Sequence, residues 1–83
     1  MEKSLGSDEY ARLVALLVAV RQKAGVRQQM LAKKLGRPQS FVAKYEGGER
    51  RLDLVEFVTI AEALEADPVK LLKTFLRSRA VKP

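Results

Sequence analysis

Basic side chains are concentrated in residues 27–51, which make up less than a third of the 83-residue chain. This stretch holds seven lysines and arginines against two glutamates, so it carries five of the six net positive charges of the sequence. A concentrated positive field attracts a polyanion, and nucleic acid is the commonest one available. The alternative is a solvated basic surface without a partner, and charge alone leaves the two interpretations about even.

The sequence contains no cysteine and no histidine. Disulfides, thiolate zinc sites, imidazole metal ligands and the usual Ser-His or Cys-His catalytic pairs are therefore excluded. No phosphate-binding glycine loop and no nucleophile paired with a base stand out in the pattern. We expect a binding protein and no enzyme, with no cofactor.

The length and the 47% hydrophobic content suit one domain with a single core. The longest uncharged apolar run, LVALLVAV at residues 13–20, is far shorter than the roughly 20 residues that cross a bilayer. We therefore expect a domain over residues 7–80, with a flexible start over 1–6 and a tail over 81–83. No membrane segment is expected, and the lack of cysteine fits a cytoplasmic location.

Helical spacing of apolar residues predicts five helices. The first is capped by Ser7 and ends at Lys23 or Ala24, and the others cover about residues 28–35, 39–46, 54–66 and 68–79. Gly25, Gly36 and Gly47 follow the first three segments, as expected for helix stops. Asp53 and Asp67 stand where the caps of the last two helices belong. No segment alternates with period two, so we expect an all-α fold, a compact five-helix bundle.

Each expected helix has an apolar face. The second and third helices are anchored by Leu31, Ala32, Leu35, Val42 and Tyr45. The fourth is expected to pack through Leu54, Phe57, Ile60, Ala61 and Leu64. On the fifth, one side shows Val69, Leu72, Phe75 and Leu76.

Over about residues 10–75 the chain resembles the Cro and phage-repressor type of helix-turn-helix domain, a lambda-repressor-like fold. The matching stretches are GVRQQMLAKKL at 25–35, Gly36 in the turn, QSFVAKYEGG at 39–48 and IAEAL at 60–64. The resemblance implies that the second and third helices form the helix-turn-helix. It also implies that the third helix enters the major groove of double-stranded DNA and that homodimers read two half-sites about one helical turn apart.

The resemblance implies that one face of the third helix contacts the DNA bases. Gln39, Ser40 and Lys44 take positions that typically face base edges, and Ala43 lies beside them. The side-chain chemistry agrees, because glutamine can donate and accept at an adenine edge and lysine can reach the acceptors of guanine.

Phosphate binding falls to the flanks of the motif. Gln28 lies in the first turn of the second helix, where the family uses an amide and the helix dipole to hold a phosphate. Further phosphate contacts are expected from Arg27, Arg37, Arg50 and Arg51. Such contacts position a protein on DNA but carry little sequence information.

An internal ion pair is also implied, between Arg21 late in the first helix and Glu46 at the end of the third. The alternative is that the two side chains do not pair and that water solvates each of them. Phe41 is expected to pack inward beside Val42, the alternative being contact with a thymine methyl group.

The chain departs from the family pattern at two helix starts. Arg27 and Pro38 stand where serine or threonine usually caps the second and third helices, and neither offers a side-chain acceptor. Pro38 can instead serve as the first residue of the third helix. Both helix starts are therefore open to a shift of one residue.

The fifth helix carries more apolar residues than one core-facing stripe needs. The expected homodimer interface comprises Leu71, Leu72, Phe75 and Leu76, the alternative being their burial within the monomer. The resemblance implies a transcriptional regulator, with repression favoured. A module that binds a regulatory protein partner, such as an antitoxin-like protein, is the alternative, and an exposed apolar patch on the fifth helix would favour it.

Overall fold

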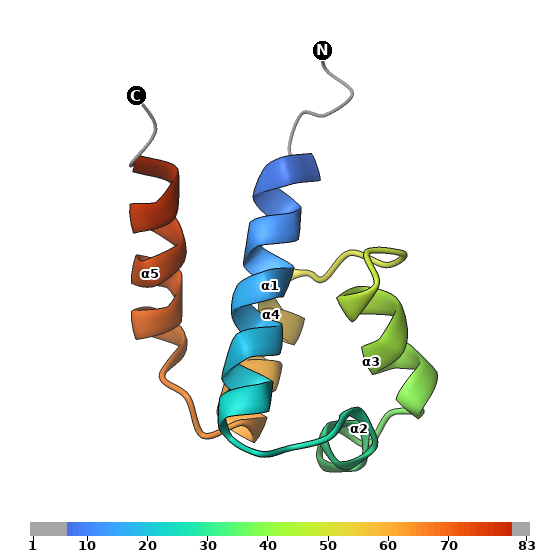
Figure 1. Cartoon of the computed structure of the whole chain (residues 1–83). Coiled ribbons are helices and arrows are strands. Elements are labelled where there is room, and N and C mark those ends of the chain that lie inside the picture. Colours follow the sequence, from blue (N-terminus) through green and yellow to red (C-terminus); the bar gives the residue numbers. More distant parts are fainter. Residues whose placement is uncertain (1–6, 81–83) are drawn as a thin grey trace.

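The computed structural model describes residues 7–80 and the side chains of residues 8–79. The described residues form five helices (Figure 1): α1 (Ser7–Lys23), α2 (Gln28–Leu35), α3 (Gln39–Glu46), α4 (Leu54–Ala63) and α5 (Pro68–Ala80). This is the predicted all-α bundle. The predicted flexible start at 1–6 and tail at 81–83 lie outside the described residues, and so does the side chain of Ser7.

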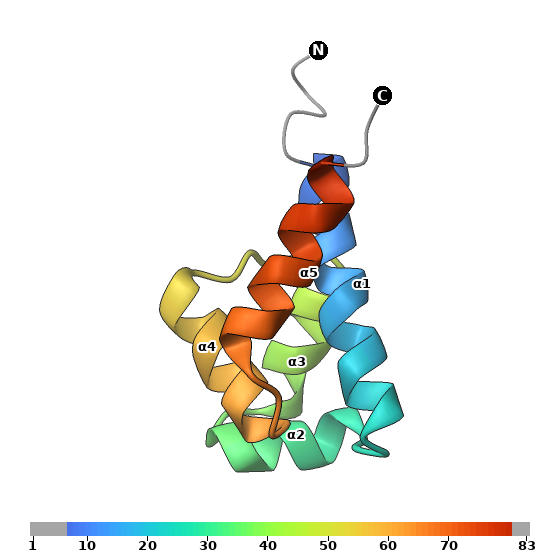
Figure 2. The ribbon, with the colours of Figure 1, turned by 90° about the vertical axis from the view of Figure 1, so that its left-hand side faces the viewer.

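Figure 2 shows the molecule turned so that α5 faces the viewer. α1 and α5 run side by side and rise together above the other three helices. α2 packs against α3 and α4, while α1 packs against α3 and α5. α3 is thus supported from behind by α1 and α2, and one side of it stays at the surface. No helix in the described part of the chain is long and apolar enough to cross a membrane.

One core joins all five helices. Its largest completely buried side chains are Leu17, Leu31, Val42, Tyr45 and Ile60, and α5 contributes Leu71. Burying one large apolar side chain stabilises a fold by about 1.5–3 kcal/mol. α3 buries Phe41, Val42 and Tyr45 within its 8 residues, so this short helix is held mainly by packing.

The starts of α2 and α3 lie where the apolar spacing predicted them. Arg27 and Pro38 occupy the cap positions in extended conformation, and neither side chain bonds a free N–H. Pro38, with ψ of 154°, precedes the helix, so the expectation that it serves as the first helical residue is wrong. Gly36, with φ of 67°, turns the chain between the two helices, and the N–H of Arg37 donates to the carbonyl of Ala32 at 3.0 Å.

α4 ends at Ala63, three residues before the predicted end. Glu65 takes a left-handed conformation with φ of 59°, and the N–H of Ala66 then donates to the carbonyl of Ala61 at 2.9 Å. This closing pattern normally uses glycine, so no residue type in this segment indicates it. The predicted inward face of α4 also begins one turn late, because Leu54 is 70% exposed whereas Phe57 is buried.

The apolar side predicted for α5 is largely exposed. Val69, Leu72 and Leu76 are on the surface, and Phe75 is half-buried. The core contact comes instead from Leu71, which packs in the same cluster as Leu17 and Ile60. Leu71 was predicted as an interface residue, and its burial within the monomer removes it from that set.

Candidate nucleic-acid interface

The two sides of α3 differ completely in exposure. Gln39, Ser40, Ala43 and Lys44 are all exposed, whereas Phe41, Val42 and Tyr45 are buried. Residues three and four apart lie on the same side of a helix, so Ser40, Ala43 and Lys44 share one face. The four positions predicted to read bases therefore lie together on the open side of the helix, which we call the reading face.

A partly buried carboxylate fixes the end of α3 to two other helices. Glu46 accepts hydrogen bonds from Arg21 Nε at 2.7 Å and from Arg21 Nη2 at 3.0 Å, so the predicted ion pair is present. Gln28 Nε2 donates to the same carboxylate at 2.8 Å, and Arg21 also donates to the carbonyl of Val26 at 2.8 Å. The hydrogen bond to Glu46 raises the pKa of Arg21. One carboxylate thus joins α1, α2 and α3.

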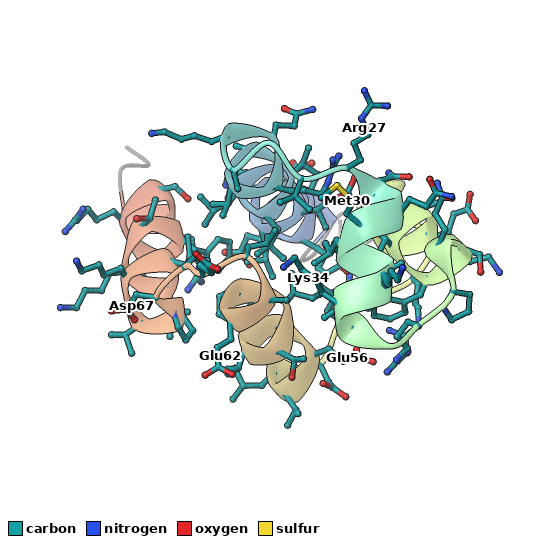
Figure 3. All side chains as sticks on the ribbon, turned by 90° about the horizontal axis from the view of Figure 1, so that it is seen from below. Arg27, Met30, Lys34, Glu56, Glu62 and Asp67 are labelled. Carbon is teal, nitrogen blue, oxygen red and sulfur yellow. The ribbon has the colours of Figure 1, made fainter. Side chains whose placement is uncertain are left out.

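The bond from Gln28 to Glu46 was not foreseen. It gives the amide a partner inside the protein and orients it at the first turn of α2. The side chain of Arg27 gives this turn no cap, and Arg27 is exposed and points away from the helices (Figure 3). The N-terminal end of α2 therefore presents backbone N–H groups and a positive dipole end beside a guanidinium group.

On the other edge of the reading face, two arginines stack on one aromatic ring. The guanidinium carbon of Arg37 lies 4.2 Å from the centroid of the Phe41 ring, and that of Arg50 lies 4.8 Å from it. Phe41 is only 7% exposed and meets Tyr45 edge to face, with ring centroids 5.6 Å apart. Phe41 therefore packs inward, as expected, and supports the two arginines from below.

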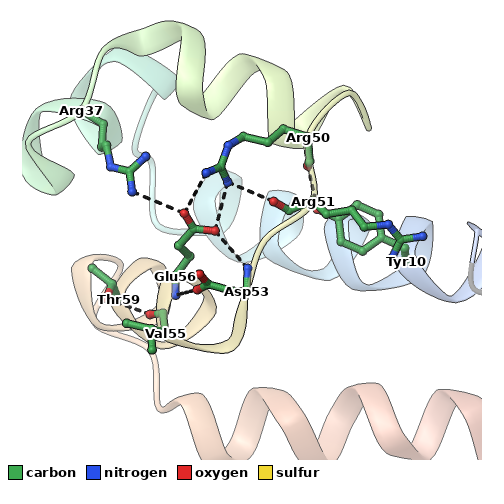
Figure 4. A network of polar contacts seen from close by, with 8 residues as sticks. All are labelled: Tyr10, Arg37, Arg50, Arg51, Asp53, Val55, Glu56 and Thr59. Atoms are coloured by element: carbon green, nitrogen blue, oxygen red, sulfur yellow. Dashed lines mark hydrogen bonds and ion pairs between the residues drawn. The ribbon is translucent and has the colours of Figure 1, made fainter.

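Both arginines also share the carboxylate of Glu56 at the start of α4 (Figure 4). Arg50 donates from Nη1 and Nη2 to its two oxygens, each at 3.0 Å, and Arg37 Nη2 donates at 3.3 Å. The N–H of Asp53 donates to Glu56, and the N–H of Glu56 donates back to Asp53, which forms a capping box. Hydrogen bonds from Arg50 and from the Asp53 backbone lower the pKa of Glu56 to about 2.

Sequence reasoning found the Asp53 cap but missed Glu56. The signal was available, because a cap residue followed three positions later by glutamate is the pattern of a capping box. Its bonds to Arg37 and Arg50 were not predictable, since they span 19 and 6 positions and depend on how the loops before and after α3 lie against the start of α4.

The loop between α3 and α4 is tied back to α1. Tyr10 Oη donates to the carbonyl of Arg50 at 2.9 Å, and the guanidinium of Arg51 lies 4.7 Å from the Tyr10 ring centroid. Burial raises the pKa of Tyr10. Arg51 remains exposed, so its charge is held at a defined place on the surface.

Nothing in the described side chains suggests a metal centre, because they contain no group of three or more histidine, cysteine, aspartate or glutamate residues that could hold an ion. What the arrangement offers is a polar reading face with positive groups on both of its edges. Arg27 and the end of α2 lie at the Glu46 edge, and Arg37 and Arg50 lie at the Phe41 edge.

Comparison with known proteins gives matches to a family model and to solved structures. The model of a family described as a helix-turn-helix domain matches residues 12–72. Among solved structures, the chain is similar to an XRE-family like protein from Pseudomonas syringae pv. tomato str. DC3000, with 42% sequence identity and a TM-score of 0.86. That match covers 98% of this chain and 95% of the other. No curated protein sequence matches the chain.

The family model spans most of the chain, and the solved structure agrees with the fold over nearly its whole length. Both matches include α2, the turn at Gly36 and α3. The chain therefore belongs to the helix-turn-helix family of the Cro and phage-repressor type, whose members are DNA-binding regulators.

Proposed function

We propose that the protein binds double-stranded DNA sequence-specifically and regulates transcription, with the reading face of α3 in the major groove. The observation that carries this proposal is the separation of α3 into a buried anchoring side and an exposed polar side. A major groove about 12 Å wide admits an α-helix. Binding without catalysis is typical of this family, so no enzymatic step is proposed.

Four side chains are placed to read bases. Gln39 can bond both the N6 and N7 positions of adenine, and Lys44 can donate to O6 and N7 of guanine. Ser40 can donate or accept at several bases, and Ala43 offers a small methyl group that allows close approach or contact with thymine. Sequence preference is therefore expected to depend most on Gln39 and Lys44.

Phosphates would be held on both edges of the reading face. Arg27, Gln28 and the open first turn of α2 serve one strand, since helix N-termini bind phosphate through backbone N–H groups. Arg37, Arg50 and Arg51 serve the other strand. These contacts supply most of the sequence-independent affinity and make it salt-dependent.

Repression follows most simply from occupancy, because a bound protein over a promoter blocks polymerase without further chemistry. We further propose a homodimer formed through the exposed Leu72 and Leu76 and the open part of Phe75 on α5. A two-fold dimer would read two half-sites about one helical turn apart.

Selection from a pool of random duplexes tests the proposal directly. We expect an enriched motif in which one short sequence is repeated in inverted orientation. Failure to enrich any motif at low salt would overturn DNA reading. A single unrepeated motif would support DNA reading and overturn the homodimer.

A protein partner is the second candidate. The observation that favours it is the apolar strip of Val69, Leu72 and Leu76, which are 61%, 41% and 46% exposed. An antitoxin-like protein could bind DNA through α3 and a partner through this strip. Stoichiometric co-purification of a different protein, lost when Leu72 and Leu76 are changed to serine, would support it over the homodimer.

A further inference from the structure

We propose that Glu56 is a positioning residue for DNA binding, which holds Arg37 and Arg50 as a clamp for one backbone phosphate at the Phe41 edge of α3. The clamp consists of Arg37, Arg50 and Glu56. This inference rests on the proposed function, since it assigns a role within the same DNA-binding surface to a carboxylate that does not touch DNA.

The place of the clamp on α3 supports this assignment. Ser40 lies near the centre of the reading face, and at 100° per residue Phe41 and Glu46 fall about 100° and 120° away from it on opposite sides. A helix in the major groove has a phosphate backbone along each side. Because Glu46 already orients Gln28 at one edge, the clamp occupies the corresponding place at the other edge.

The relative depth of the carboxylate and the two guanidinium groups below the surface also supports the proposed clamp. The Glu56 side chain is 15% exposed, whereas those of Arg37 and Arg50 are 43% and 39% exposed. The carboxylate therefore lies behind the two guanidinium groups, which present their outer sides to solvent. A pocket of about 120 Å³ is lined by Arg37, Phe41 and Glu56, so the cluster is open to approach beside Arg37.

Both arginines keep donors for an additional anion. A guanidinium group has five N–H donors. Arg37 uses one of these donors in its hydrogen bond to Glu56. Arg50 uses three, two for the oxygens of Glu56 and one for the carbonyl of Arg51. Two guanidinium groups sharing one carboxylate leave a net positive charge, and planar guanidinium donors match the geometry of phosphate oxygens.

Without the carboxylate the two arginines would separate. Both lie over the same ring, so their like charges repel, and Glu56 bonds both of them in this arrangement. Removing the Glu56 carboxylate is therefore expected to weaken DNA binding, even though the removal makes the protein more positive. A carboxylate that only masked the arginines would have the opposite effect.

The test compares Glu56→Gln with Glu62→Gln in the full chain. Each variant removes one carboxylate charge from α4, but Glu62 is an exposed side chain away from the clamp. Glutamine keeps an oxygen for the Asp53 N–H, so the cap of α4 is preserved. Binding to the duplex selected by the wild-type protein is measured by fluorescence anisotropy at several salt concentrations, with thermal unfolding as the check on folding.

We expect Glu56→Gln to bind about tenfold more weakly, the effect of one lost charge-assisted contact. The slope of log affinity against log salt concentration should become less steep by about one, the change expected for one lost phosphate contact. Glu62→Gln should bind at least as tightly as the wild type with an unchanged slope. The Arg37→Gln/Arg50→Gln double variant should lose at least as much slope, and adding Glu56→Gln to it should change the slope no further.

Tighter binding with a steeper slope in Glu56→Gln would overturn the inference, because Glu56 would then mask the arginines. Equal behaviour of Glu56→Gln and Glu62→Gln would overturn it too. If Glu56→Gln unfolds, the arginine double variant decides, and an unchanged slope there overturns the clamp. Failure of the wild-type protein to bind any duplex would overturn the proposed function itself, whereas the other outcomes leave DNA binding intact.

Discussion

At the scale of single residues, two exposed basic side chains are placed for different tasks. Lys44 lies on the reading face of α3, while Arg51 lies in the following loop against the ring of Tyr10. Lysine on the reading face can reach base edges, whereas an arginine outside it can reach only the phosphate backbone. Their substitutions should therefore differ in kind.

We expect Lys44→Ala to relax sequence preference, reducing the affinity for the selected duplex by about 1–3 kcal/mol and that for random duplexes far less. Arg51→Ala should weaken all duplexes evenly and flatten the salt dependence by about one phosphate contact. Competition binding with selected and random duplexes at several salt concentrations separates the two effects. Equal behaviour of the two variants would contradict the assigned roles.

Tyr45 anchors α3 in the core, but its hydroxyl group lowers the free energy of unfolding. Its oxygen is buried without a hydrogen-bond partner, and burial raises the pKa of this phenol. A buried polar group left unpaired costs about 1–3 kcal/mol. We therefore expect Tyr45→Phe to increase the free energy of unfolding by about 1 kcal/mol, measured by urea denaturation.

Tyr10→Phe is the matched control, because the Tyr10 hydroxyl bonds the carbonyl of Arg50. The same chemical change should lower stability there by about 1 kcal/mol. A loss of stability in both variants would show that the Tyr45 hydroxyl has a partner in solution.

At the scale of elements, the start of α4 connects the candidate interface to the rest of the fold. Its capping box joins Asp53 and Glu56, and Glu56 extends the network to both sides of α3. Asp53→Ala should lower the free energy of unfolding by about 1 kcal/mol through loss of the cap. Glu62→Ala on the exposed face of α4 should change it by only about 0.5 kcal/mol or less. Similar losses for both variants, in urea denaturation, would contradict a specific role for the cap.

Acid should remove the contribution of Glu56 over a defined range of pH. Its pKa falls from 4.5 to about 2 in the folded protein, so the folded state favours the ionised carboxylate. The resulting stability is fully present above pH 4.5 and is lost as pH falls from 4.5 to about 2. The difference in stability between the wild type and Glu56→Gln, followed by thermal unfolding, should shrink across this range. A difference that stays constant from pH 6 to about 2 would show that Glu56 is not ionically paired.

Most of the elements were predictable because their signals are local. Gly36 and Asp53 mark helix ends by their own backbone and side-chain chemistry, and the apolar spacing placed α2 and α3 to the residue. The end of α4 was not predictable, because Glu65 adopts a left-handed conformation that glycine usually provides. The bond between Gln28 and Glu46 and the sharing of Glu56 by two loop arginines depend on how helices and loops pack in three dimensions, which no local pattern contains.

At the scale of the whole molecule, the exposed apolar strip on α5 sets the expected oligomeric state. We expect the wild-type protein to dimerise in a concentration-dependent way and Leu72→Ser/Leu76→Ser to remain monomeric, because covering apolar surface drives association. Light scattering at several concentrations measures this. Met30→Ser, which changes an apolar side chain of 48% exposure on α2, is the control and should dimerise normally.

A wild-type protein that stays monomeric at high micromolar concentration would remove both the dimer and the inverted repeat from the proposal. Dimers that persist in the α5 variant would place the interface on another face, where Leu54 and Val55 are 70% and 73% exposed.

The division of α3 into buried and exposed residues has a practical consequence for engineering. Phe41, Val42, Tyr45 and Glu46 carry its attachment to the fold, so we expect combinatorial libraries at Gln39, Ser40, Ala43 and Lys44 to leave the scaffold intact. Variants drawn from such libraries could be retargeted to new operators, and a pair with different preferences would give orthogonal switches on one scaffold.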